Sequence, residues 1–247
     1  MRHRSESGEA EDRPFWHQRG WQLSAVFVAL LLCMGVVVAL SGGPDAAAKR
    51  AEQPIVPGPL SSGAGPDGSR PGGCHTDDTD QTAPAQPPGD VTWRPLNGAK
   101  VPLSASAGPV KSSGQVLWCF AHTPLGAVMA ANVIPRQMSG SAWRTVTEQQ
   151  VVAGNARDVF VAMRSSQQGA PPQYTANSMA GFMVMSYSPD TAVVRLLIKQ
   201  PPAVYATTDF TVAWDGGDWK VKALAGGDLH TPVTAVTANG GFVMWKV

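Results

Sequence analysis

Hydrophobic residues are unevenly distributed along the chain, and the longest unbroken apolar run lies near its start. Residues 23–40 carry no charge, and Ser24 is their single polar side chain. As a helix, these 18 residues would be about 27 Å long, close to the ~30 Å hydrocarbon core of a bilayer. A buried helix of a soluble domain would show a polar stripe, and none is visible here. The pattern predicts a transmembrane helix over residues 23–40.

The flanking charges predict how this segment is oriented. Four arginines precede it, whereas Lys49 and Arg50 are the basic residues that follow closely. The positive-inside rule then predicts a cytoplasmic tail over residues 1–22 and a domain outside the cell membrane. A cleaved signal peptide stays open as the alternative, although the apolar run is longer than the usual ~7–15 residues of such a peptide.

Residues 41–90 show no apolar periodicity, and we expect a disordered linker there. They contain 9 Gly and 9 Pro but no aromatic residue. Such a composition buries too little apolar surface to offset the entropy of ordering the chain. The run from Cys74 to Asp80 combines Cys, His and three Asp residues. It lacks the Gly turn and distal Glu of a calcium loop, so a solvated acidic linker explains it better than a metal site.

A helical period begins after Thr123, which is a good N-cap before Pro124. Apolar residues then recur at helical spacing up to Pro135, where we expect the helix to end. Two further helices are predicted over residues 145–153 and 156–166, with Gly154 between them.

From Met179 onward the period changes to two, which predicts β-strands. Strands are expected over residues 179–187, 192–198, 205–214 and 219–224, with a tight hairpin at residues 215–218 (DGGD). Helices followed by an antiparallel meander define an α+β fold over residues 91–247, with the helices packed on one face of the sheet. The closing apolar residues 242–245 are expected to dock on this domain.

Cysteine use agrees with an external domain. Cys33 lies inside the apolar run, which leaves Cys74 and Cys119 as an even pair on the side predicted to be oxidising. A disulfide between them is the favoured interpretation. Two unrelated buried thiols remain the alternative.

The net charge of +1 conceals a partition along the chain. Residues 1–40 carry a net charge of 0, residues 41–90 carry −4 and residues 91–247 carry +5. A domain of this modest charge is not expected to bind nucleic acid, although acidic wall polymers or anionic lipid could attract it.

Candidate chemistry is sparse, and we predict no catalytic residue, metal or cofactor. His122 precedes a helix N-terminus, where a neutral imidazole could polarise a carbonyl, but a structural capping role is simpler. Cys119 could be a nucleophile only if it were unpaired. The alternation of Met183 and Met185 suggests, beside His122, a weak candidate pocket, although such methionines usually belong to a core.

Several short motifs resemble those of single-span actinobacterial membrane proteins of unknown function. The motifs are residues 118–127 (WCFAHTPLGA), 180–182 (AGF), 186–189 (SYSP), 212–214 (VAW), 217–220 (GDWK) and 241–242 (GF). By layout alone, the chain also resembles the bitopic assembly proteins of type IV secretion and conjugation systems. That resemblance implies a nuclear-transport-factor-2-like or cystatin-like domain on a curved antiparallel sheet.

Two functions follow as expectations. The first is a membrane-anchored extracytoplasmic interaction domain in an envelope complex such as a transfer apparatus, with the lipid bilayer and envelope proteins as partners and a homo-oligomer left open. The second is a domain that binds a small molecule or a cell-wall ligand. The layout of anchor, linker and domain favours the first, and a pocket between helices and sheet would favour the second.

Overall fold

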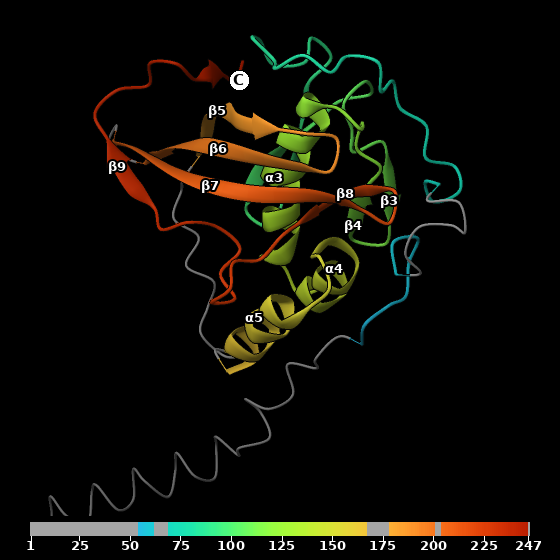
Figure 1. The fold of residues 1–247 in the computed structure, drawn as a ribbon. Helices are drawn as coiled ribbons and strands as arrows, with labels where there is room; N and C mark the ends of the chain where they lie inside the picture. The colour runs from blue at the N-terminus through green and yellow to red at the C-terminus, as the bar shows by residue number, and fades with distance from the viewer. Residues whose placement is uncertain (1–53, 62–68, 167–177, 201–203, 247) are drawn as a thin grey trace, which may run out of the picture. The chain divides into compact units, whose positions relative to one another are not determined.

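Helix α3 (Pro124–Met138) packs across one face of a six-stranded antiparallel sheet (Figure 1). The computed structural model describes residues 54–61, 69–166, 178–200 and 204–246. Helices and an antiparallel sheet together confirm the predicted α+β class.

Several predicted segments lie outside the described residues. They are the cytoplasmic tail (1–22), the transmembrane helix (23–40) and parts of the linker (41–53 and 62–68). Among the residues that are described, no helix combines the length and apolar character needed to cross a bilayer.

Helix α3 begins as predicted but ends later. The Thr123 hydroxyl accepts a hydrogen bond from the Gly126 N–H at 3.1 Å, and Pro124 occupies the first turn. The expected end at Pro135 is wrong, because the helix continues through this proline to Met138. A proline removes one hydrogen bond and does not forbid a further turn. Here Asn97 supports that turn by donating to the carbonyls of Arg136 and Gln137 at 2.9 and 3.2 Å.

Small residues let α3 lie close to its neighbours. Ala127, Ala130 and Ala131 are fully buried against the core. A Cβ on Gly126 would overlap the carbonyl oxygen of Ala121, so only glycine fits at this approach.

Two shorter helices follow, and both predicted helices are confirmed with shifted ends. They are α4 (Trp143–Gln150) and α5 (Asn155–Ser166), separated by Gly154 at a φ of 139°. Thr145, at the predicted start of this helix, lies inside α4 and accepts a hydrogen bond from the Val56 N–H at 3.2 Å. Helix α5 is loosely packed, because Phe160 is its single buried residue.

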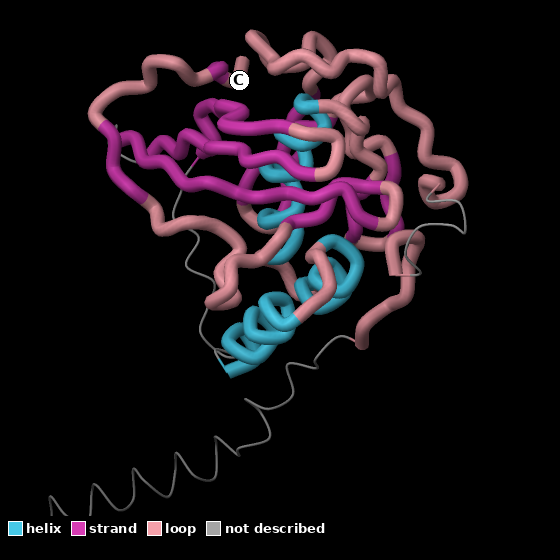
Figure 2. The backbone as a smooth tube through the Cα atoms, viewed as in Figure 1, coloured by secondary structure: helices cyan, strands magenta, loops and turns pink. Residues whose placement is uncertain are grey.

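The main sheet has the strand order β10-β5-β6-β7-β8, with β9 also paired to β7 (Figure 2). Its strands are β5 (Ser178–Tyr187), β6 (Thr191–Gln200), β7 (Val204–Asp215), β8 (Asp218–Val221), β9 (Thr234–Val236) and β10 (Val243–Met244). The four predicted strands are therefore confirmed as an antiparallel meander. Gly216 and Gly217, with φ of 66° and 79°, form the predicted tight turn between β7 and β8.

One face of this sheet forms the core with α3. Phe182, Val194, Leu196, Phe210 and Val212 are buried on that face. Strand β5 contains two register shifts, between Met179 and Gly181 and between Val184 and Ser186. Bulges of this kind bend a strand and increase its twist.

Two small hairpins precede the helices. They pair β1 (Thr92–Leu96) with β2 (Ala99–Leu103), and β3 (Lys111–Ser113) with β4 (Val116–Trp118). The predicted apolar tail is also confirmed, because β10 pairs with β5 and Trp245 is buried against Trp93 and Phe182.

The linker prediction for residues 41–90 needs correction over its described part. Leu60 and Cys74 are buried in the core, and Asp90 accepts hydrogen bonds from Ser104 and Ser106. Residues 54–61 and 69–90 therefore belong to the folded unit. Composition suggested otherwise because it does not show contacts with distant parts of the chain.

Two buried glutamine side chains attach β4 to the helices. Gln137 accepts a hydrogen bond from the Leu117 N–H and donates to the Leu117 carbonyl at 3.1 Å. Gln150 donates to the same carbonyl at 2.8 Å and accepts from Gln137 at 2.8 Å. Together the two amides complete the hydrogen bonding of a strand that has no further strand beside it in the described residues.

Replacing Gln137 with leucine tests this attachment. The Q137L variant would leave the buried Leu117 N–H without its acceptor, and we expect a loss of about 2 kcal/mol in the free energy of unfolding. The matched control is Q115L in the exposed β3–β4 turn, where we expect a change within about 0.5 kcal/mol. Urea unfolding measures both, and equal losses in the two variants would contradict the assignment.

Candidate functional site

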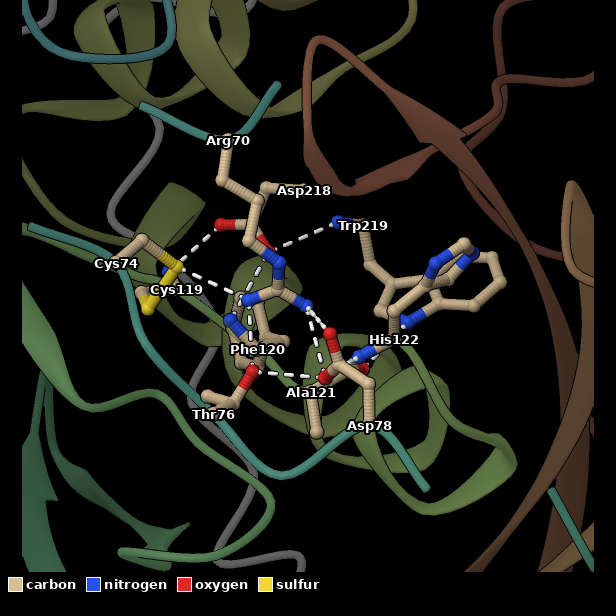
Figure 3. The surroundings of a disulfide bond; sticks show 10 residues. All are labelled: Arg70, Cys74, Thr76, Asp78, Cys119, Phe120, Ala121, His122, Asp218 and Trp219. Carbon is tan, nitrogen blue, oxygen red and sulfur yellow. Dashed lines mark hydrogen bonds and ion pairs between the residues drawn. A yellow bond between two sulfur atoms is a disulfide. The ribbon is translucent and has the colours of Figure 1, made fainter. Parts of the chain in front are cut away.

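A disulfide joins Cys74 to Cys119 and confirms the predicted pair (Figure 3). The two Cα atoms lie 5.5 Å apart, although the residues are separated by 45 positions in the sequence. Both side chains are buried. The bridge fastens the segment after Ser69 to the turn that leads into α3.

The turn at Cys119 has an unusual backbone, and the buried carboxylate of Asp218 supports it. Cys119 has a φ of 71°, a value that few residues other than glycine adopt. Its N–H and that of Phe120 donate to the two carboxylate oxygens of Asp218 at 2.7 and 2.9 Å. The N–H of Trp219 donates to the same carboxylate at 3.0 Å. Three main-chain donors thus converge on one side chain at the start of β8.

Burial dominates the electrostatics of Asp218. Removal from water raises the pKa of this carboxyl to about 6, although its three hydrogen bonds and the charge of Arg70 act in the opposite direction. The main-chain N–H groups therefore stabilise the carboxylate, but its protonation state changes near pH 6.

Arg70 links the disulfide to the segment around it. Its guanidinium donates to Thr76 at 2.7 Å and to both carboxylate oxygens of Asp78 at 2.9 and 3.0 Å. One of its nitrogens lies 3.1 Å from the sulfur of Cys74, and the guanidinium also lies over the ring of Trp214 at 4.9 Å. A planar cation with several fixed donors suits this role, because one arginine orders several groups at once.

Asp78 connects the Arg70 network to the residues just before α3. Its Oδ1 accepts the N–H of His122 at 2.7 Å, and its main-chain carbonyl accepts a hydrogen bond from Gln81. Gln81 also donates to the carbonyl of His122 and accepts from the hydroxyl of Tyr187. The chain around residues 70–81 is therefore bound to both α3 and β5.

The ring of His122 is held between an aromatic surface and a carbonyl. It stacks on Trp214 with a centroid distance of 3.7 Å and an interplanar angle of 11°. Its Nε2 lies 2.6 Å from the carbonyl oxygen of Pro189 and must donate, since a carbonyl only accepts. These contacts match the structural interpretation of His122 better than the catalytic one.

Met183 and Met185 do not lie beside His122. Phe182 and Val184 pack toward α3, so Met183, between them in the strand, faces the other side of the sheet, where it pairs in register with Arg195. Met185 is exposed at the second bulge of β5. His122 lies on the α3 side, so the structure does not bring these three candidate residues into one pocket.

The acidic run after Cys74 forms local turns. Asp77 accepts from the N–H and hydroxyl of Thr79, and Asp80 accepts from the same two groups of Thr82. These hydrogen bonds lower the pKa values of both exposed carboxyls. In the described ranges, no group of three or more His, Cys, Asp or Glu side chains is placed to hold a metal ion.

Two shallow cavities lie elsewhere on the domain. One of about 290 Å³ is lined by Asp90, Leu103, Ser104 and Val110 among others. The other, of about 270 Å³, lies between Ile55 and the helices α4 and α5. Both are below the ~300–1,000 Å³ that is usual for small-molecule sites.

Sequence reasoning missed the groups that organise the site. Asp218 was read as a turn residue and Arg70 as part of a linker. For Asp218 a signal was present, because an aspartate directly before Trp219 in an apolar strand is out of place unless its carboxylate has partners. For Arg70 we find no comparable signal in the sequence.

The described region is thus a disulfide-bonded α+β domain whose titratable groups support irregular main chain. Residues 55–244 match the model of a family described as a domain of unknown function, DUF8175, and the chain belongs to that family. No curated protein and no solved structure matches the chain.

Removal of the disulfide is the first test of this site. For a separation of 45 residues, loop-closure entropy predicts that C74S/C119S loses about 4 kcal/mol of unfolding free energy. C33S is the control and is expected to keep the stability of the unaltered chain. Chemical unfolding and thiol counting measure the effect. The bridged chain has one free thiol, at Cys33, and three free thiols in the unreduced protein would refute the bridge.

The second test concerns pH. The folded pKa of Asp218, about 6, lies above its ordinary value of 3.8, so between these values the folded state binds a proton that the unfolded state does not. Its titration therefore stabilises the fold as pH falls, by about 1 kcal/mol from pH 7 to pH 5. This contribution levels off below about pH 3, where the unfolded carboxyl is protonated as well.

Comparison of variants isolates this contribution from other groups. D218N should lack this gain, whereas D190N, at an exposed turn, should retain it. Because D218N could fail to fold, the carboxyl carbon of Asp218 in the unaltered chain is also followed by NMR. An inflection near pH 4 instead of pH 6 would contradict the prediction.

Proposed function

We propose that this chain is a membrane-anchored extracytoplasmic interaction domain, with a cytoplasmic N-terminus and a single span over residues 23–40. The observation that carries the proposal is the buried Cys74–Cys119 disulfide. Structural disulfides persist in oxidising compartments and are rare in the cytosol of most cells. An apolar run of 18 residues upstream supplies the means to anchor such a domain at the outer surface.

The use of the polar side chains also favours an interaction role. Asp218 binds three main-chain N–H groups, His122 is stacked on Trp214, and Arg70 is occupied by Thr76 and Asp78. These three groups thus support the fold. We therefore expect function to reside in the surface.

A finer form of the proposal assigns the domain to an envelope assembly, such as a conjugation or type IV secretion-like apparatus, with envelope proteins or further copies of the chain as partners. It also assigns the sheet to a nuclear-transport-factor-2-like or cystatin-like fold. Support comes from the placement of α3 on one face of the meander and from the bulges in β5.

The alternative is a domain that binds a small molecule or a cell-wall ligand. It needs a site that converges on the ligand, and the two described cavities, of about 290 and 270 Å³, are small. The interaction role therefore has the better support.

Localisation of the full chain tests the proposal. After an alkaline wash, the protein should remain in the membrane pellet, with its disulfide intact and a C-terminal tag open to added protease. The variant L31R/V36R places two charges in the apolar run and should lose membrane retention. G42R/G43R places the same charges just beyond the run and should retain it.

The outcomes separate the alternatives. A soluble chain in which Cys74 and Cys119 are free thiols would refute the proposal. A retained chain that crosslinks into a larger assembly would support the interaction role, whereas a monomer whose melting temperature rises with a small ligand would support the alternative.

A further inference from the structure

The first described residues of the folded unit pack against helix α4. The N–H of Val56 donates to Thr145 at 3.2 Å, and the side chain of Gln149 donates to the carbonyl of Val56 at 3.1 Å. Leu60 is buried in the core a few residues later. The entry segment, residues 54–61, is therefore part of the domain surface next to α4.

Because the folded unit begins near residue 54, the linker between it and the predicted span is shorter than the 41–90 segment expected from the sequence. Between residue 40 and Pro54 there are 13 residues, for which coil scaling gives a typical reach of about 20 Å and full extension gives about 45 Å. A folded unit over residues 53–247 has an expected radius of gyration of about 16 Å, and thus a width of about 40 Å. The usual reach is shorter than the domain is wide, so an anchor over residues 23–40 would favour an orientation with the entry side toward the bilayer.

The surface around the entry segment has the composition of a membrane-facing surface. Four of the eight large apolar side chains exposed among the described residues lie on the entry segment and α5: Ile55, Val56, Val159 and Met163. The guanidinium groups of Arg144 and Arg164 lie over the ring of Trp143 at 4.8 and 4.9 Å. Trp and Arg are both favoured at the headgroup level of a bilayer.

Electrostatics contributes little to this surface. Arg157 pairs with Glu148 at 3.4 Å. Asp158 lines the cavity of about 270 Å³ between Ile55 and the helices α4 and α5 and adds a negative charge there. Contact with lipid would therefore rest on apolar burial and on proximity. A short tether raises the effective concentration of the surface to the millimolar range, so weak contacts suffice.

We infer that the entry segment and α5 form the membrane-facing surface of the domain and rest on the lipid headgroups of the bilayer that anchors the chain. This inference depends on the proposed membrane anchor. It identifies a lipid surface as the partner of this side of the domain. The remaining exposed apolar side chains lie on β5, β7, β10 and at the end of the loop before β9.

Methionine methyl groups provide matched probes for the test. Met163 on α5, Met185 on β5 and Met244 on β10 have similar exposed fractions of 37%, 44% and 37%. Figure 1 shows α5 at one end of the folded unit and β5 at the other. The full chain, labelled with ¹³C at its methionine methyls, is placed in lipid nanodiscs that carry a gadolinium headgroup, and M163L, M185L and M244L assign the signals.

We expect the relaxation enhancement at Met163 to exceed that at Met185 and Met244 at least threefold. The variant I55E/V159E should reduce the Met163 enhancement at least twofold, whereas V204E/V233E, which alters two other exposed valines, should not. Equal enhancements, an enhancement led by Met185 or Met244, or no enhancement in loaded nanodiscs would each overturn the inference and leave the anchor intact. A chain that does not enter the nanodiscs would overturn both.

Discussion

The carboxylate of Asp218 supports the turn on which the rest of the site depends. Cys119 adopts a positive φ of 71°, and the N–H groups of this turn point inward, where water cannot reach them. Asp218 is the acceptor for two of them. This turn directs Cys119 toward Cys74 and leads within a few residues to the start of α3. The disulfide and the position of His122 therefore follow from one buried hydrogen-bonded group.

Buried polar side chains also satisfy main-chain groups at a second place in the core. The amides of Gln137 and Gln150 satisfy the main chain of Leu117, much as a neighbouring strand would. A domain with short strands and irregular connections exposes many main-chain groups to its interior, and each must find a partner. Buried polar side chains supply these partners here. They fix the geometry of short segments whose main chain is only partly paired in a helix or sheet.

The three helices and the four strands of the meander were predictable from the sequence, because their signals are local, whereas the hairpins β1–β2 and β3–β4 and the strand β9 were not predicted. The period of two located the meander, the Gly-Gly turn of its last hairpin was found, and Thr123-Pro124 marked the start of α3. The site was predictable only in its cysteine pair. Asp218 acts on a residue 99 positions away, and Arg70 contacts Trp214, which is more distant still in the sequence; such partners leave no periodic trace. Composition likewise misread residues 69–90, since a disulfide and an arginine network order a segment that buries little apolar surface itself.

The distribution of polar and apolar groups separates the supports of the fold from the surfaces available for contact. Titratable groups near the disulfide are engaged with main chain, with each other or with aromatic rings. The exposed apolar side chains instead form two sets, one on the entry segment and α5, the other mainly on the strands. If the set on the entry segment and α5 faces lipid, the set on the strands remains available to bind a partner in the envelope. An anchored domain with two such sides suits an assembly role better than a closed binding pocket would.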